Sequence, residues 1–266
     1  MSKKRVLIVT QEMEPYTDPS VIAEISRKLP QYIQEKGMEI RVLMPRFGTI
    51  NERRHRLHEV VRLSGMNIIV DDDDFPLIIK VASLQEARMQ VYFLDNDDFF
   101  RRKSTFEDDD GTPYEDNPDR MVFFCKGVIE TVKKFGWAPD IIHCHGWMTS
   151  LIPLYLKTAY KSEPLFQNSK VVYSIYDSPY EQMYSDKFLA KASINNLTTS
   201  DLSSYQDGEG VTLHKGAVAY SDAVIIGSEG AVVPDTDKPV LGLQGEDYLA
   251  AYMDFYHSLL PVEESK

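Results

Sequence analysis

The start of the chain contains the pattern that most constrains the fold, because a buried strand, a polar loop and an amphipathic helix follow one another. Arg5–Thr10 carries a continuous apolar run, which is typical of a strand buried on both faces of a parallel sheet. Apolar residues then recur at helical spacing from Ile22 to Ile33, and a second apolar strand follows at Ile40–Met44. This order predicts a βαβ unit and therefore a parallel sheet.

The loop between this strand and helix, Gln11–Ser20, contains carboxylates and no glycine. We expect Asp18 to cap the helix, with Pro19 at its first position, and Gly37 to close it. Parallel sheets bind ligands at the carboxyl ends of their strands, so the loop should line a crevice. A dinucleotide fingerprint needs glycines that let the backbone approach a pyrophosphate, so nicotinamide-type binding is not expected here.

Strand and helix patterns alternate along the rest of the chain. A basic stretch at Arg46–Arg56 leads into a strand-rich insertion or meander over residues 59–94. Helices are expected from Asn117 to Gly136, over 147–160 and over 213–220, and strands over 138–145, 170–176 and 223–226. The pattern predicts an α/β fold built on a single doubly wound, mostly parallel, Rossmann-like sheet.

Composition excludes several classes of function. The net charge of −12 repels nucleic-acid backbones and anionic lipid, so neither nucleic acid nor a membrane is an expected partner. A neutral polymer such as a polysaccharide meets no such penalty. Cys125 and Cys144 belong to no CxxC pair and are expected to be buried free thiols. Without a signal-peptide core or a segment of transmembrane length, the expected location is the cytoplasm.

Two further patterns invite a metal assignment that the residues do not support. The acidic run Glu107–Asp110 precedes a glycine at EF-hand spacing, but Phe106 would occupy the first ligand position, where an aspartate is needed. We interpret this run as a solvated loop, and Asp71–Asp74 as a turn. His143 and His145 alternate on one strand face, and no third ligand is apparent. No metal and no cofactor are predicted.

Several segments, in a fixed order, resemble the N-terminal domain of bacterial glycogen synthases and plant starch synthases. They cover most of residues 1–230 and comprise Gln11–Pro15, Val42–Pro45, Tyr114–Arg120, Asp140–Trp147 and Lys215–Asp222. The resemblance implies a GT-B architecture, in which two Rossmann-like domains face each other and glucose passes from ADP-glucose to an α-1,4-glucan. It also implies an N-terminal domain over 1–231, a linker over 232–245, and a C-terminal helix and tail over 246–266 that pack back on that domain.

The chain departs from the family pattern at the strand ends that face the crevice. Where the family's first loop has a lysine and two glycines, the chain has Asp18, Ser20 and Val21. A carboxylate a few ångströms from a diphosphate costs on the order of a few kcal/mol at an effective dielectric near 20. The family's His-x-His-Asp-Trp appears with Gly146 in place of the aspartate, and its His-Asn appears as Tyr176 and Asp177.

The remaining candidate site residues follow from the resemblance and from their places at strand ends. Tyr114, Asn117 and Arg120 match a family element near the glucan acceptor, and the equal alternative is an ordinary helix start with Asn117 as its N-cap. Trp147 offers a flat face for a sugar ring or packs in the core. Glu12 is a candidate crevice acid. No set of nucleophile, base and orienting group is recognisable, so catalytic residues stay unassigned.

We therefore expect a glycogen or starch synthase-like protein that retains the acceptor-side half of the enzyme and is weak or inactive alone. Whether it is an enzyme is left open. The expected ligands are an α-glucan or ADP-glucose. One alternative is a non-catalytic regulatory or glucan-binding subunit that binds a partner protein, and another is a transferase whose site is rebuilt between two copies of the chain.

Overall fold

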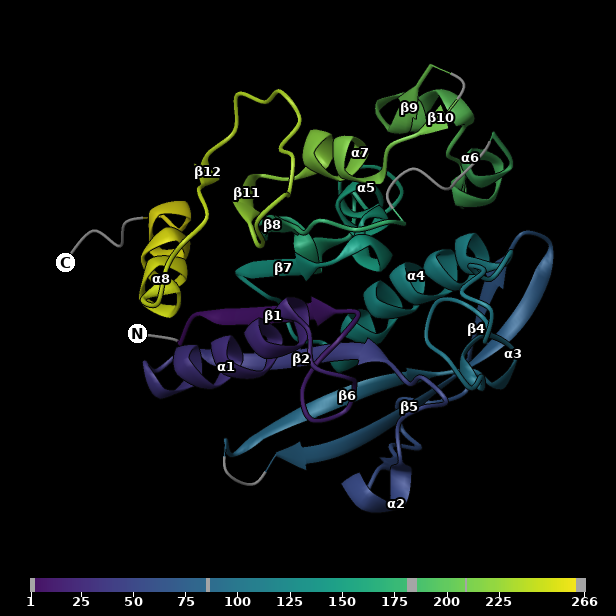
Figure 1. Ribbon diagram of the computed structural model, residues 1–266, viewed down its shortest axis with the longest axis horizontal. Helices are drawn as coiled ribbons and strands as arrows, with labels where there is room; N and C mark the ends of the chain where they lie inside the picture. Colours follow the sequence, from purple (N-terminus) through teal and green to yellow (C-terminus); the bar gives the residue numbers. More distant parts are fainter. Residues whose placement is uncertain (1–2, 85–86, 181–185, 209, 262–266) are drawn as a thin grey trace.

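The computed structural model describes residues 3–84, 87–180, 186–208 and 210–261. Its main feature is one mixed sheet with the strand order β12-β11-β8-β7-β1-β2-β6-β5-β3, and β4 pairs with β5 beside this path. Figure 1 shows this order running from β12 at the upper left to β5 near the bottom. The strands are β1 Arg5–Thr10, β2 Glu39–Pro45, β3 His58–Glu59, β4 Met66–Val70, β5 Asp73–Leu84, β6 Met89–Asp95, β7 Ile141–His145, β8 Lys170–Ile175, β11 Ala223–Ile226 and β12 Val240–Leu241.

The pairing from β12 to β6 is parallel throughout, and only β3, β4 and β5 run antiparallel to their neighbours. The predicted α/β fold with a mostly parallel sheet is thus confirmed. The meander predicted over residues 59–94 is also confirmed, with a turn at Asp71 and Asp72 between β4 and β5. A separate small ribbon pairs β9 Gln206–Asp207 with β10 Gly210–Val211.

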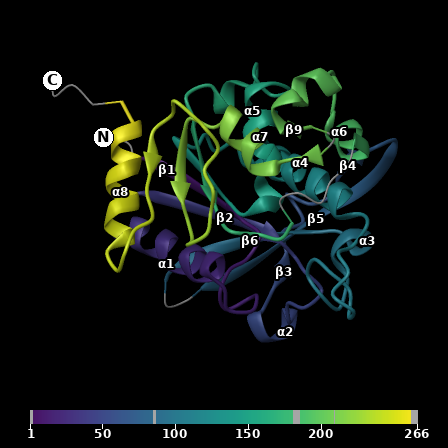
Figure 2. The ribbon, with the colours of Figure 1, turned by 45° about the horizontal axis from the view of Figure 1, so that its top comes forward.

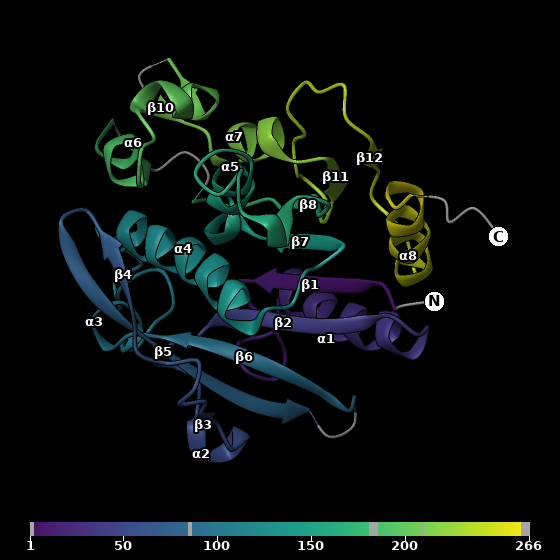
Figure 3. The same cartoon turned by 180° about the vertical axis from the view of Figure 1, so that it is seen from behind.

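Helices cover both faces of the sheet. On one face, α1 Val21–Glu35 packs on β1 and β2, and α8 Tyr248–Leu259 packs beside α1, as Figure 2 also shows. The other face carries α4 Asn117–Phe135, α5 Leu151–Lys157 and α7 Leu213–Tyr220, and Figure 3 shows α4 lying across it. Shorter elements are α2 Glu52–His55, α3 Asp97–Phe100, α6 Asp186–Ala192, η1 Trp147–Thr149, η2 Pro164–Phe166 and η3 Thr199–Tyr205.

The prediction for the start of α1 was wrong by two residues. Ser20, not Asp18, is the N-cap, and its hydroxyl accepts a hydrogen bond from the Ala23 N–H at 3.0 Å. Pro19 consequently lies before the helix. The Ser20 hydroxyl also donates to the Glu12 carboxylate, so a tertiary contact, absent from any local pattern, selects which polar residue caps the helix.

The N-cap alternative for Asn117 was wrong as well. The cap of α4 is Asp116, whereas the Asn117 side chain accepts a hydrogen bond from Arg120 and donates one to the Phe106 carbonyl. Gly136 ends α4 in the left-handed region at φ 62°, as expected. The helix predicted over 147–160 divides into η1 and α5 and ends at Lys157.

The C-terminal helix packs back on the sheet as predicted. Tyr252, Met253 and Tyr256 are buried, and the Tyr256 hydroxyl is hydrogen-bonded to His143 of β7. The segment 232–245, predicted as a linker, carries β12, which extends the sheet beyond β11. Within the described residues, no helix combines the length and the apolar character needed to cross a membrane.

Candidate functional site

The topology of the sheet creates a crevice between β1 and β7. From β1 the chain winds through α1 to β2 on one side, and from β7 it winds through α5 to β8 on the other, so the loops after β1 and β7 diverge. Doubly wound sheets bind ligands at such a switch point, at the carboxyl ends of the strands.

A cavity of about 330 Å³, which we call the crevice, lies at this point. Most of its lining comes from the loops that follow four strands: Gln11 and Glu12 after β1, Gly146 and Trp147 after β7, Tyr176–Tyr180 after β8, and Ser228 and Glu229 after β11. Ser20, Val21, Ile22 and Phe106 complete the lining. An adjoining cavity of about 420 Å³ shares residues 176–179 with the crevice and continues toward His214 and Val232.

Glu12 is held in place inside the crevice. One carboxylate oxygen accepts a hydrogen bond from the Gln11 amide at 2.8 Å, and the other accepts one from the Ser20 hydroxyl. Because Ser20 caps α1, the carboxylate is tied to the start of that helix. Glu12 is half-buried, so it still faces the cavity with acceptor capacity for a ligand hydroxyl.

Gly146 and Gln11 form a matched pair on the opposite wall. Gly146 adopts φ 87° and ψ 166°, and a Cβ there would overlap the Gln11 side chain. The side-chain Oε1 of Gln11 accepts a hydrogen bond from the Met148 N–H at 3.1 Å. The side chain of Gln11 thus fills the space that any residue larger than glycine at 146 would need.

His143 and His145 are fully buried beneath the crevice. His143 bonds to Tyr256 and to Ser174, and the Nδ1 of His145 bonds to the Tyr176 hydroxyl at 2.7 Å. Burial lowers the pKa of His145 to about 3, and burial together with His145 lowers the pKa of His143 well below its usual value. Both imidazoles are therefore neutral at pH 7 and supply no positive charge.

Aromatic rings form the outer wall of the crevice. Trp147 is 1% exposed, and the ring of Tyr180 stacks on it with centroids 5.3 Å apart. Phe106 packs edge-on against Trp147 at 5.1 Å. The Tyr180 hydroxyl donates to Glu107 at 2.8 Å, which fixes this half-buried ring at the mouth. The accessible aromatic face is thus that of Tyr180, and the Trp147 face is covered.

Tyr114, Asn117 and Arg120 come together, but behind the crevice wall. The fully buried Arg120 donates to the Asn117 side chain at 2.6 Å and to the Phe99 carbonyl at 2.8 Å, and the Tyr114 ring lies 5.3 Å from its guanidinium carbon. Asn117 in turn donates to the Phe106 carbonyl at 2.8 Å. This cluster positions the Phe106 segment and does not line the cavity.

The predicted acidic residues divide between the cavity and the solvent. Asp18 is exposed and lies outside the residues that line the crevice, whereas Glu12 and Asp177 line it. Among the described residues that line the cavity, three carboxylates are present, from Glu12, Asp177 and Glu229, and no lysine or arginine. Negative potential in the crevice therefore comes from these three groups.

Sequence reasoning missed several lining residues. Glu229 lies three residues after the predicted strand over 223–226, so the strand-end rule that selected Asp177 could have selected it. Phe106 and Tyr180 had no such signal, because each reaches the crevice from a loop whose path depends on tertiary contacts. No cluster of three or more metal-ligating side chains occurs within the described part of the chain.

Comparison with known protein families identifies the domain type. Residues 5–232 match the family described as the starch synthase catalytic domain. Glycogen synthase of Pelodictyon phaeoclathratiforme is 39% identical over 201 residues, which are 75% of this chain and 40% of that protein. Glycogen synthase of Chlorobaculum tepidum is 34% identical over 96% of this chain and 52% of its own length. The chain thus spans about half the length, or less, of these curated relatives.

A solved structure shares the fold. The catalytic domain of starch synthase IV from Arabidopsis thaliana, bound to ADP and acarbose, superposes with a TM-score of 0.72 at 20% identity. The match covers 84% of this chain and 45% of that one. The α/β sheet of this chain therefore has the Rossmann-like fold found in a GT-B starch synthase.

Proposed function

The chain belongs to the glycogen and starch synthase family, and on that premise we propose that its crevice is the carbohydrate subsite of a glycogen or starch synthase-like glucosyltransferase. The proposed ligand is a glucose unit of an α-1,4-glucan. In this proposal, the adjoining cavity, which shares residues 176–179 with the crevice, binds the adjacent part of the same glucan.

The composition of the crevice lining carries this proposal. Carboxylates accept hydrogen bonds from hydroxyl groups, and the half-exposed ring of Tyr180 offers an apolar face to the C–H side of a sugar. A neutral sugar carries no charge, so the three carboxylates Glu12, Asp177 and Glu229 do not repel it. The volume of about 330 Å³ is at the small end of ligand sites and suits a short saccharide segment.

The same lining disfavours the diphosphate of ADP-glucose. One carboxylate and one phosphate charge about 4 Å apart repel each other by about 4 kcal/mol at an effective dielectric near 20. The buried histidines are neutral and supply no compensating charge. We therefore propose that the crevice binds glucan and, by itself, holds ADP-glucose weakly, and that this chain alone transfers glucose slowly or not at all.

Calorimetric titration of a maltooligosaccharide into the purified chain tests the sugar subsite. We expect saturable binding that Glu12→Gln weakens, because an amide in that position accepts fewer hydrogen bonds than a carboxylate. Glu14→Gln is the matched control, since Glu14 lies two residues along the same loop and outside the crevice. Equal binding by the two variants, or no binding by the wild-type chain, refutes the assignment.

A second candidate is a non-catalytic glucan-binding or regulatory subunit that completes the crevice with another chain. Exposed apolar side chains favour it: Val21 at the crevice rim is 51% exposed, and Val232 beside the adjoining cavity is 79% exposed. Turnover of ADP-glucose, measured over a range of protein concentrations, tests for a site shared between copies: a specific activity that rises with concentration supports it, and zero activity throughout removes it. Maltooligosaccharide affinity of the purified chain then favours the carbohydrate subsite over a purely regulatory subunit.

A further inference from the structure

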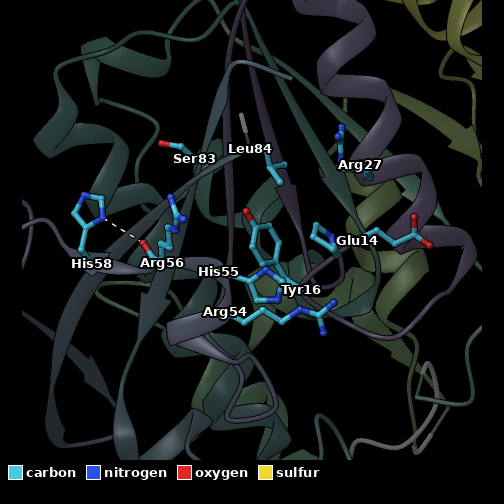
Figure 4. Close-up of a pocket in the computed structure, with 10 residues that line it drawn as sticks. Glu14, Tyr16, Arg27, Arg54, His55, Arg56, His58, Ser83 and Leu84 are labelled. Atoms are coloured by element: carbon cyan, nitrogen blue, oxygen red, sulfur yellow. Dashed lines mark hydrogen bonds between the residues drawn. The ribbon is translucent and has the colours of Figure 1, made fainter. Parts of the chain in front are cut away.

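A second and larger cavity, which we call the basic cavity, lies away from the crevice. It has a volume of about 860 Å³ and opens between the loop before α1, α1 itself, α2 and the end of β5 (Figure 4). The described residues that line it are all different from those that line the crevice. Glu12 faces the crevice and Glu14 faces the basic cavity, so the same loop forms a wall of each.

The charge of this lining contrasts with that of the whole chain. Among the described lining residues, Arg27 of α1, Arg54 of α2 and Arg56 just after α2 contribute three guanidinium groups, against one carboxylate from Glu14. The chain as a whole carries −12. A cavity with a net positive charge raises the local concentration of anions, because its cationic side chains attract them while the acidic remainder of the protein repels them.

Two of these guanidinium groups are available to a ligand. Within the described ranges, neither Arg54 nor Arg56 forms an ion pair. The acidic residue of α2, Glu52, is bound instead by Arg46 at 3.0 Å and Lys80 at 2.8 Å. Cations outside α2 therefore neutralise its carboxylate, and Arg54 and Arg56 remain exposed at the cavity.

Packing fixes the wall that carries these arginines. The His55 ring lies edge-on to the Tyr16 ring with centroids 5.0 Å apart, and Tyr16 packs in the same way on Phe93 of β6 at 4.9 Å. Figure 4 shows His55 and Tyr16 side by side, with Arg54 and Arg56 on the α2 side and Arg27 and Glu14 opposite. Arg56 closes α2 at φ 55°, in the left-handed region that glycine or asparagine adopts more readily.

We propose that the basic cavity binds a small anion with at least two negative charges on phosphate groups. The planar guanidinium fork pairs with two phosphate oxygens at once, and two arginines on one rigid segment can hold two such groups. His55 and His58 add ring nitrogens for hydrogen bonds at the same wall. Glu14 can accept hydrogen bonds from hydroxyl groups that such a ligand carries beside its phosphate groups.

Isothermal titration with inorganic pyrophosphate at low salt tests this site. The variants are Arg54→Gln and Arg56→Gln, and Arg53→Gln is the matched control because Arg53 is exposed on α2 and does not line the cavity. We expect saturable binding by the wild-type chain and by Arg53→Gln, binding about tenfold weaker in each single variant, and none in the double variant. Thermal unfolding verifies that each variant is folded.

Two results overturn the proposal: no saturable pyrophosphate binding by the wild-type chain, or the same affinity in Arg53→Gln and in the double variant. The second result would place the anion elsewhere, for instance in the crevice. Maltooligosaccharide binding, measured on the same variants, is expected to be unchanged. This keeps the outcome for the basic cavity separate from the outcome for the sugar subsite.

Discussion

Replacing Gly146 by alanine perturbs the crevice at the wall that this glycine shares with Gln11. The backbone of Gly146 lies in a region that is essentially restricted to glycine, so the new side chain costs about 1–3 kcal/mol in strain. Its Cβ would also overlap the Gln11 side chain, which is buried and hydrogen-bonded to the Met148 N–H. Displacing Gln11 leaves that buried donor unsatisfied, at about 1–3 kcal/mol more.

We therefore expect Gly146→Ala to lower the free energy of unfolding by about 4 kcal/mol, measured by urea denaturation. Gly37→Ala is the control, because Gly37 has φ 99° and no atom within 4 Å of the position that a Cβ would take, so only strain, about 2 kcal/mol, applies. In a Gln11→Ala background there is no side chain to displace, and Gly146→Ala should cost only about 2 kcal/mol. If Gly146→Ala costs no more than Gly37→Ala, or costs the same in both backgrounds, the coupling between Gln11 and Gly146 is refuted.

Three further predictions concern the buried groups. Burial lowers the pKa of His145 to about 3 and of His214 to about 4, so the unfolded chain takes up protons below pH 6.5 that the folded chain does not, and stability falls as the pH falls. Urea denaturation from pH 7 to 5 gives the free energy of unfolding of the wild type and of His214→Asn. This free energy should fall with pH less steeply in the variant, by about 1 kcal/mol per pH unit, and equal slopes would contradict this. Burial raises the pKa of Cys125 and Cys144, so a thiol reagent should label both only after unfolding; rapid labelling of the native chain would be inconsistent with their burial. Asn117→Ala removes the acceptor for Arg120 and the donor to the Phe106 carbonyl, and should cost about 2–3 kcal/mol in thermal unfolding, which a loss below about 1 kcal/mol would disprove.

The apolar pattern was sufficient to predict the framework of the fold. Runs such as Arg5–Thr10 and Lys170–Ile175 are buried on both faces of a parallel sheet, so an uninterrupted apolar pattern predicts each strand. Gly136 marks the end of α4, as expected. The caps were less predictable. Asp18 and Ser20 are both acceptable N-caps, and the contact between Ser20 and Glu12 decides between them.

The site was predictable only where residues directly follow strands. Glu12, Trp147, Tyr176 and Asp177 were found in this way and line the crevice. Tyr180 was missed because its position depends on a hydrogen bond to Glu107, 73 residues earlier in the chain. The basic cavity was missed because its lining comes from segments that lie far apart in the sequence. The basic stretch Arg46–Arg56 is visible in the sequence, but Arg46 pairs with Asp95 while Arg54 faces a cavity that also includes Arg27 of α1.

The proposed function depends on a crevice that accepts a neutral sugar and rejects a diphosphate. The decisive experiment titrates a maltooligosaccharide and ADP-glucose separately into the Arg54→Gln, Arg56→Gln double variant, at equal ionic strength, so that the basic cavity does not hold the diphosphate. We predict saturable maltooligosaccharide binding and much weaker binding of ADP-glucose. Tight ADP-glucose binding by this double variant, which the maltooligosaccharide displaces, would place the diphosphate in the crevice and show that its three carboxylates do not exclude it.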